Sequence, residues 1–226
     1  MILEFIGTKG NVEGGKKHRN NASLVIKSKD KKIQIDFGES FIYKNPKADF
    51  ILITHLHPDH IGGLREDLKA KVIAPRPIAK EIGAIPITPN KSYNINGFQI
   101  KAVEIAHSPK YKTFAYIIKR EGKTILYAPD VLNIPVKYLK DIDVYIGDGA
   151  ALQKPIVRQT KEGPFGHTSI INQIKKLKKH NPHAKIIFSH LGQKVIDLGS
   201  KRIAQYLSHI FEKEIIIPYD NEKIKI

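Results

Sequence analysis

The sequence predicts an α/β protein in which helices cover layers of β-sheet. Short apolar segments of strand type are mixed with segments of helical spacing along both halves of the chain. Several of the apolar segments end in histidine or aspartate, the pattern of buried strands that carry functional residues at one end. The 226 residues, 41% of them hydrophobic, suffice for one large core. We therefore expect a single domain over residues 1–226.

Composition narrows the chemistry and the partners. The chain has 38 Lys and Arg against 22 Asp and Glu, and the net charge of +16 favours an anionic partner, with nucleic acid among the candidates. A lysine-rich, heat-adapted surface is the alternative. Because there is no cysteine, any metal must be held by His, Asp or Glu. No apolar run is long enough for a membrane span and no signal pattern opens the chain, so we expect a cytoplasmic protein with no membrane partner.

The first part of the chain is expected to form three strands and one loop. Residues 2–6, 22–27 and 32–37 have strand patterns, and residues 7–20 form a glycine-containing loop with basic residues. This loop is either a rim that contacts phosphate or a solvated connection. Asp36 ends the third strand, where its carboxylate either orients a neighbouring histidine or forms an ordinary turn.

Residues 50–60 are the most informative stretch, because an apolar strand there ends in His55, His57, Asp59 and His60. Three histidines and an aspartate within six positions are too dense for a chance cluster of solvated residues. His55 and His57 are two residues apart and can converge on one ion, while Asp59 and His60 can reach a second. Imidazole with carboxylate favours zinc and also accepts manganese or iron. A short helix is expected to begin at Ile61.

The middle of the chain supplies two further candidates at strand ends. A strand at 71–74 and a short helix at 77–82 precede a hairpin of residues 92–95 and 98–105, which ends just before His107. His107 is either another ligand or an exposed histidine. A second hairpin, 113–119 with 123–128, ends before Asp130. A carboxylate there can place one oxygen on each of two metals, or it can cap the next segment.

The last part begins with a strand at 143–146, followed by Asp148, which either supports the site or is a turn residue. Residues 152–166 are expected to form a flexible wall of the site. His167 then comes directly before a helix capped by Thr168 or Ser169, where free backbone amides favour an anion such as phosphate; a solvated capping histidine is the alternative. A strand at 184–189 ends in His190, and a helix at 200–211, a strand at 214–218 and a polar tail follow.

With these elements in this order, the sequence resembles the metallo-β-lactamase superfamily of metallohydrolases. The resemblance implies a four-layer αββα sandwich with a metal centre at one edge of two packed sheets. It assigns one metal to His55, His57 and His107. It assigns a second metal to Asp59, His60 and His190, with Asp130 bridging the two. Asp36 matches the early structural aspartate of the family.

The segments that look most like the branch containing RNase Z and cyclic-phosphate diesterases are Phe5-Ile6-Gly7-Thr8, Arg19-Asn20, Asp36-Phe37-Gly38-Glu39 and Gly166-His167-Thr168-Ser169. This implies a phosphodiesterase or nuclease with two divalent metal ions, and it implies contact between His167 and the scissile phosphate. The expected catalytic residues are Asp59, Asp130 and His167. The expected substrate contacts are Lys16, Lys17, Arg19, Lys154 and Arg158. A thioester, lactone or amide hydrolase of the same fold and a nonenzymatic nucleic-acid-binding protein with structural metals are the alternatives, and a homodimer is a family-based expectation.

Overall fold

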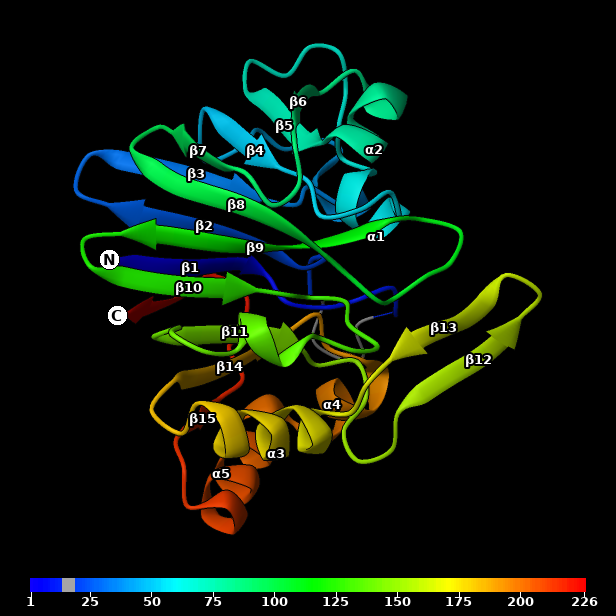
Figure 1. Ribbon diagram of the computed structural model, residues 1–226, viewed down its shortest axis with the longest axis vertical. Helices are drawn as coiled ribbons and strands as arrows, with labels where there is room; N and C mark the ends of the chain where they lie inside the picture. The colour runs from blue at the N-terminus through cyan, green and yellow to red at the C-terminus, as the bar shows by residue number, and fades with distance from the viewer. Residues whose placement is uncertain (14–18) are drawn as a thin grey trace.

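The computed structural model describes residues 1–13 and 19–226, which form two seven-stranded sheets packed face to face and a separate hairpin (Figure 1). In spatial order, the first sheet consists of β16 (Glu222–Lys225), β1 (Ile2–Gly7), β2 (Ser23–Ser28), β3 (Lys31–Ile35), β4 (Phe50–Leu52), β5 (Lys71–Pro75) and β6 (Ile85–Ile87). The second consists of β15 (Ile215–Ile216), β14 (Lys185–Ser189), β11 (Val144–Asp148), β10 (Lys123–Tyr127), β9 (Thr113–Arg120), β8 (Phe98–Ile105) and β7 (Ser92–Ile95).

The largest hydrophobic core lies between the two sheets. Because side chains alternate across a strand, each sheet sends one set of apolar residues inward. Phe5 of β1 and Tyr116 of β9 belong to this core, and both are fully buried. The Tyr116 hydroxyl donates a hydrogen bond of 2.6 Å to the carbonyl of Ile53, which follows β4. This contact ties the second sheet to the chain segment that carries the first predicted metal ligands.

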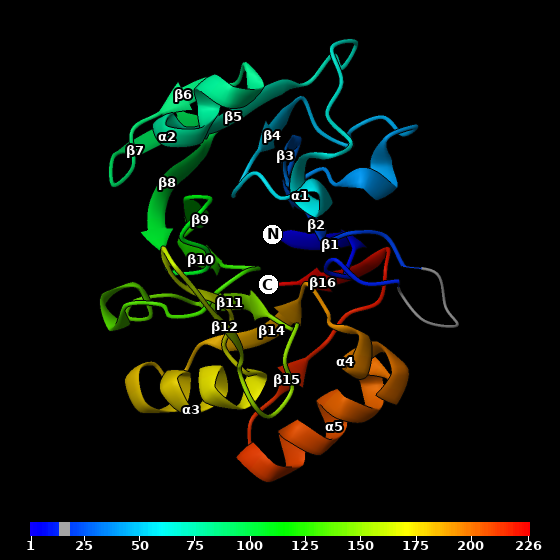
Figure 2. The same cartoon turned by 90° about the vertical axis from the view of Figure 1, so that its right-hand side faces the viewer.

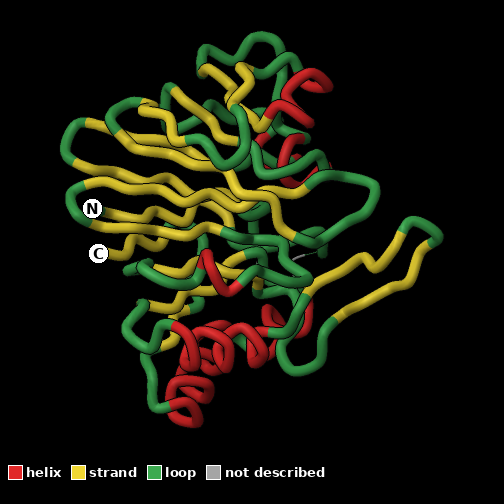
Figure 3. Tube along the Cα trace, in the orientation of Figure 1, coloured by secondary structure: helices red, strands yellow, loops and turns green. Residues whose placement is uncertain are grey.

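Helices complete the layers outside the sheets (Figures 2 and 3). On the second sheet lie α3 (Ile170–His180), α4 (Gln193–Leu198) and α5 (Ser200–Phe211), while the short α1 (Pro58–Ile61) and α2 (Arg76–Ala79) lie beside the first. Short 3-10 turns occur at η1 (Glu39–Phe41), η2 (Lys80–Ile82) and η3 (Val136–Tyr138). This is the αββα architecture that the sequence predicted. No helix in the described part of the chain is long and apolar enough to cross a membrane.

The structure differs from the sequence-based elements in several places, including β6 and α4, which the sequence pattern did not indicate. The C-terminal tail forms β16, which pairs with β1 and places Ile224 opposite Leu3. The helix near the site is α1, which begins at Pro58 and ends before Gly62, because proline fits the first turn of a helix. Residues 152–166 are not a loop, since they contain most of a hairpin, β12 (Ile156–Thr160) with β13 (Gly163–His167).

The hairpin of β12 and β13 projects from the body of the protein near the ends of β8 and β10 (Figure 1). All five residues of β12 are exposed. A strand that buries neither face shows no alternation of apolar and polar residues, and this one is flanked by Pro155, Gly163 and Pro164. Those features explain why the sequence pattern indicated a loop there.

Candidate metal centre

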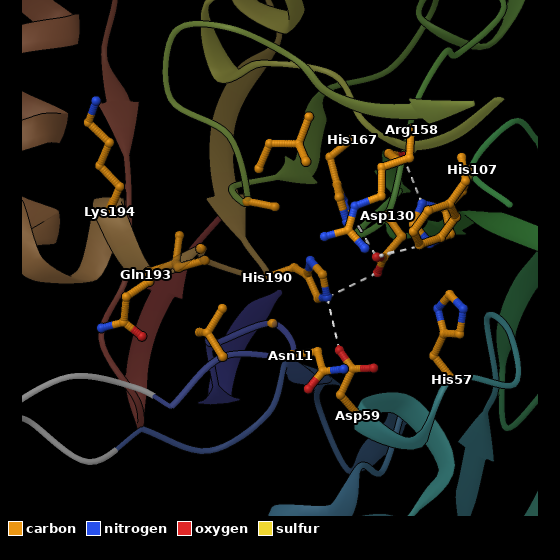
Figure 4. Close-up of a pocket in the computed structure, with 18 of the residues that line it drawn as sticks. Asn11, His57, Asp59, His107, Asp130, Arg158, His167, His190, Gln193 and Lys194 are labelled. Atoms are coloured by element: carbon orange, nitrogen blue, oxygen red, sulfur yellow. Dashed lines mark hydrogen bonds and ion pairs between the residues drawn. The ribbon is translucent and has the colours of Figure 1, made fainter. Parts of the chain in front are cut away.

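The predicted ligands come from strand ends of both sheets and meet at one edge of the sandwich (Figure 4). His55 and His57 follow β4, and two more lie on α1. The others follow β8, β10 and β14. Four strands and one short helix thus carry the ligands. The fold brings together residues that are up to 135 positions apart in the chain. The complete set is His55, His57, Asp59, His60, His107, Asp130 and His190.

The first cluster contains three imidazoles, those of His55, His57 and His107, whose ring nitrogens lie within 4.8 Å of one another. His55 Nε2 is 2.8 Å from His57 Nδ1. The Nδ1 of His107 lies 2.9 Å from the carbonyl oxygen of Gly166 and donates to it. That hydrogen bond fixes the tautomer of His107 and leaves its Nε2 lone pair facing the cluster, as in a histidine prepared for a metal.

The second cluster contains Asp59, His60 and His190. Asp59 Oδ2 lies 3.1 Å from His190 Nε2 and 3.4 Å from His60 Nε2. Behind it, His60 Nδ1 is 2.9 Å from a carboxylate oxygen of Asp36. The Asp36 carboxylate also accepts hydrogen bonds from the backbone amide and hydroxyl of Thr54. Asp36 thus holds the His60 ring with Nε2 directed into the centre, the orienting arrangement considered from the sequence.

Asp130 lies between the two clusters. Its Oδ2 is 2.9 Å from His60 Nε2 and 3.3 Å from His190 Nε2. Its Oδ1 faces the other cluster and lies 3.6 Å from His107 Nε2. A carboxylate that presents one oxygen to each of two ligand groups has the geometry required of a bridge between two ions.

The residues present fit divalent metal ions. His60 Nε2, His107 Nε2 and Asp130 Oδ2 are buried and make no hydrogen bond of acceptable geometry among the described residues. His60 Nε2 and Asp130 Oδ2 lie 2.9 Å apart and face the same region. Buried polar atoms rarely remain unpaired, so these atoms indicate a missing binding partner. The mixture of imidazole and carboxylate suits zinc and other transition metals better than magnesium or calcium.

The electrostatics of the two clusters differ. Burial lowers the pKa of His55 well below its ordinary value and that of His57 to about 4, so both rings are neutral at physiological pH and able to act as ligands. Burial also lowers the pKa of His190, but the surrounding carboxylates, Asp130 foremost, outweigh it and raise that pKa to about 10. The negative charges that retain a proton at His190 would equally attract a divalent cation.

His167 lies beside the centre, held by Asp148. Its Nδ1 is 2.7 Å from Asp148 Oδ2 and 3.7 Å from Asp130 Oδ1. Burial lowers the pKa of His167, but the charge and hydrogen bond of Asp148 overcome this and raise it. His167 therefore ends β13 with one ring nitrogen bound by a carboxylate and the other, Nε2, available to a ligand. Ser169, whose side chain accepts from the amide of Asn172, caps α3.

Asp148, which the sequence indicated as either a support of the site or a turn residue, supports the site. It is fully buried at the end of β11 and accepts hydrogen bonds of 2.9 Å from the amides of Val131 and Ala150. Gln173 of α3 donates to the Asp148 carbonyl and accepts from the Asp148 amide. Sequence reasoning missed Gln173, because its position in α3 resembles any other polar residue of an amphipathic helix.

A cavity of about 490 Å³ opens over the centre. One wall is formed by the hairpin through Ile156, Arg158 and Phe165. The opposite side is formed by the segments around Asn11 and Lys194 (Figure 4). Gly10 belongs to this rim, and a Cβ at that position would lie 2.8 Å from the His190 ring. The absence of a side chain at Gly10 thus allows the N-terminal segment to pack against a ligand.

The predicted substrate contacts have different surroundings. Arg158 lines the cavity, whereas Lys154 is exposed and does not. Arg19 is 3% exposed, and its guanidinium donates to Thr8, Ser200 and the Pro218 carbonyl. These contacts tie Arg19 to the C-terminal part of the chain, so it is not a cavity residue, contrary to the sequence-based expectation. Lys16 and Lys17 lie outside the described residues.

The fold and the ligand set are those of a metallohydrolase-like protein. Comparison with known families identifies the family to which the chain belongs. The family model described as "Beta-lactamase superfamily domain" matches residues 39–190, and the chain belongs to this family. A hydroxyacylglutathione hydrolase of Prochlorococcus marinus (strain NATL1A) is 32% identical over 123 residues, which are 51% of this chain and 47% of that protein. A ribonuclease Z of Streptococcus equi subsp. equi (strain 4047) is 31% identical over 124 residues, 50% of this chain and 40% of that protein. The matches thus span less than half of the length of these curated relatives.

Solved structures show the same fold along the whole chain. Zn²⁺-bound PqqB from Methylobacterium extorquens superposes with a TM-score of 0.77 at 13% identity and covers 100% of both chains. The metallo-beta-lactamase fold protein YhfI from Bacillus subtilis gives 0.77 at 15% identity, covering 99% of this chain and 98% of YhfI. The short form of human tRNase Z gives 0.67 at 16% identity, covering 100% and 99%. These likenesses confirm the metallo-β-lactamase fold predicted from the motifs.

Proposed function

We propose that the protein is a two-metal phosphodiesterase. The observation that carries the proposal is His167, whose Nδ1 lies 2.7 Å from Asp148 and whose other ring nitrogen, beside the metal centre, has no hydrogen-bond partner among the described residues. The seven proposed metal ligands already form two sets of three residues with Asp130 between them. His167 is therefore not needed to complete either set. A protonatable group in that position suits the departure of an alkoxide from phosphorus.

When bound, two divalent cations would supply an acidified water as nucleophile and would neutralise charge on the phosphate. Asp59 and Asp130 line the cavity and orient the attacking water by accepting its hydrogen bonds. The Nε2 of His167 donates a proton to the leaving oxygen, and the Asp148 carboxylate stabilises the protonated imidazole beforehand through Nδ1. Arg158 of the cavity wall binds a non-bridging phosphate oxygen.

The surface charge supports an anionic substrate. The net charge is +16, and the cavity wall contains Arg158 on one side and Lys194 on the other. Positive charge around a cleft increases the local concentration of an anion and its rate of encounter. Whether that anion is a cyclic phosphate, a nucleotide or a nucleic acid is a separate choice within the same proposal.

A carbonyl hydrolase is the second candidate, because two of the curated relatives are named hydroxyacylglutathione hydrolase. The decisive experiment compares the turnover of three substrates, a nitrophenyl phosphodiester, a glutathione thioester and a lactone. The protein is loaded separately with zinc, manganese or iron. The phosphodiesterase proposal requires the phosphodiester to have the highest kcat/KM. Turnover of the thioester alone would refute the phosphodiesterase proposal and support a carbonyl hydrolase.

A nonenzymatic nucleic-acid-binding protein is distinguished by the same samples. It would hydrolyse none of the compounds with its metals loaded, and it would retain salt-dependent binding to RNA or DNA after an Asp130→Ala substitution.

A further inference from the structure

The hairpin of β12 and β13 has two unequal faces. Pairing in the ladder places Ile156 opposite His167 and Arg158 opposite Phe165, so these four residues share one face. All four line the cavity over the metal centre. Val157 and Gln159 lie on the other face and do not line it. Only one face of the hairpin therefore lines the cavity, and His167 belongs to that face.

The base of the hairpin is attached to the metal centre itself. The Gly166 amide donates to the His107 carbonyl at 3.0 Å, and His107 Nδ1 donates to the Gly166 carbonyl at 2.9 Å. The Phe165 ring packs at 5.2 Å from the His107 ring and 6.0 Å from the His57 ring, centroid to centroid. These contacts hold Phe165 at the margin of the first ligand cluster, and the ring remains half-exposed on the cavity side.

Arg158 stands directly across the ladder from Phe165. Directly opposed residues have Cβ atoms about 5 Å apart, so the cation and the ring form one composite surface. Among the described residues Arg158 has neither an ion pair nor a hydrogen bond with a side chain, and Figure 4 shows its side chain extending into the cavity. An unpaired guanidinium beside a metal centre is a receptor for an anion.

The spacing suits a nucleotide. Two residues along a strand span about 7 Å, which separates Phe165 from His167 by approximately one nucleotide unit. Proteins that hold single strands combine a positively charged groove with aromatic side chains on which bases stack.

We propose that the β12–β13 hairpin is a nucleotide-binding platform, on which Phe165 stacks the base next to the scissile phosphate and Arg158 binds a phosphate oxygen. The inference rests on the proposed phosphodiesterase function and specifies its substrate as a base-bearing phosphodiester. Phe165 and Arg158 are then specificity-determining residues, distinct from the ligand set and from His167.

A matched pair of substrates tests the platform. Thymidine 5′-(4-nitrophenyl phosphate) and methyl 4-nitrophenyl phosphate have the same leaving group and differ in the nucleoside. Substitution Phe165→Leu is expected to lower kcat/KM for the thymidine ester by about 5- to 150-fold, the range for one lost base stack, and to change the methyl ester by less than about 2-fold. Substitution Arg158→Gln is expected to lower kcat/KM for both esters by about 10-fold or more.

Control variants come from the same hairpin. Val157→Ala truncates an apolar residue on the opposite face, and Lys161→Gln removes a charge at the turn, outside the cavity lining. Both should leave both esters unchanged. Metal content, measured on every variant, shows whether loss of the Phe165 ring has disturbed His57 or His107, and Phe165→Tyr, which keeps a stacking ring, should restore selectivity.

The outcomes separate the platform from the proposed function. If the metal-loaded parent hydrolyses both esters but Phe165→Leu affects them equally or not at all, the platform is refuted and the phosphodiesterase proposal stands. If neither ester is hydrolysed by the loaded parent, the phosphodiesterase proposal itself fails. Competition by a single-stranded oligonucleotide or by a nucleoside monophosphate supports the platform and identifies a strand or a small nucleotide as its ligand; competition by neither counts against it.

Discussion

Replacing His167 with alanine tests the proposed proton donor. The substitution removes a ring that is 2.7 Å from Asp148 and lies beside Asp130, while all seven proposed ligands remain. General acid catalysis by a positioned side chain contributes about 10²- to 10⁴-fold. We therefore expect His167→Ala to lower kcat by that factor for a phosphodiester with an alkoxide leaving group, equivalent to about 3–5 kcal/mol of transition-state stabilisation.

The leaving group provides an internal comparison. An acidic leaving group such as nitrophenol departs as its anion and needs little protonation, so the same variant should lose much less activity on a nitrophenyl ester. The assay measures kcat for one ester of each kind on the metal-loaded parent and variant. The matched control is His183→Ala, which makes the same chemical change at an exposed residue after α3.

Two results would refute this reasoning. Equal losses on both esters would show that His167 does not protonate the leaving oxygen. A drop in bound metal, measured by elemental analysis, would show that His167 is itself a ligand, an arrangement in which its ring nitrogen joins that of His107 and a carboxylate oxygen of Asp130.

Three further predictions concern stability. Removing metal with a chelator should lower the melting temperature, and refilling with zinc should restore it, because a ligand present at 1,000 times its Kd stabilises by about 4 kcal/mol. Arg19→Met should destabilise the fold by about 2–4 kcal/mol in denaturant titration by leaving buried acceptors unpaired, with kcat/KM of the folded protein unchanged; reduced substrate affinity without destabilisation would contradict this. Burial raises the pKa of Glu4, but Lys27 and Lys47 outweigh burial, and the net effect is a lowered pKa. The stabilisation by the ionised carboxylate is therefore present above pH 4.5 and is lost as the pH falls through the pKa of the folded state. Glu4→Gln should therefore cost about 1 kcal/mol at neutral pH, and the difference should disappear in acid.

The sequence was most informative where local patterns are strong. The hairpin that turns at Asn96-Gly97 and the helix α5 (Ser200–Phe211) have the predicted bounds, because turn chemistry and apolar spacing are encoded within a few residues. The strand ends before His107 and Asp130 were likewise visible. It was least informative for β16 and for the hairpin of β12 and β13, whose pairing partners or exposed faces leave little periodicity.

Close packing around the centre was also outside the reach of sequence patterns. A Cβ on Gly38 would lie 1.9 Å from the carbonyl oxygen of Asp59, so the segment after β3 can approach α1 only without a side chain there. Asp36, two residues earlier, has a positive φ of 60°, a conformation that few residues adopt. Both features follow from contacts between segments distant in the chain, which no local pattern records.

The sequence by itself determined the residue types of the centre and the strand ends that carry them, because motif spacing and apolar runs are local properties. The αββα architecture was implied by the resemblance of these motifs to a known superfamily. Only the tertiary structure decided that Asp148 binds His167, that Arg19 is buried, and that Arg158 and Phe165 share one face over the cavity. These relations depend on which strands neighbour one another and on how the hairpin is attached at His107. They arise from long-range packing of the two sheets, which a reading of neighbouring residues does not contain.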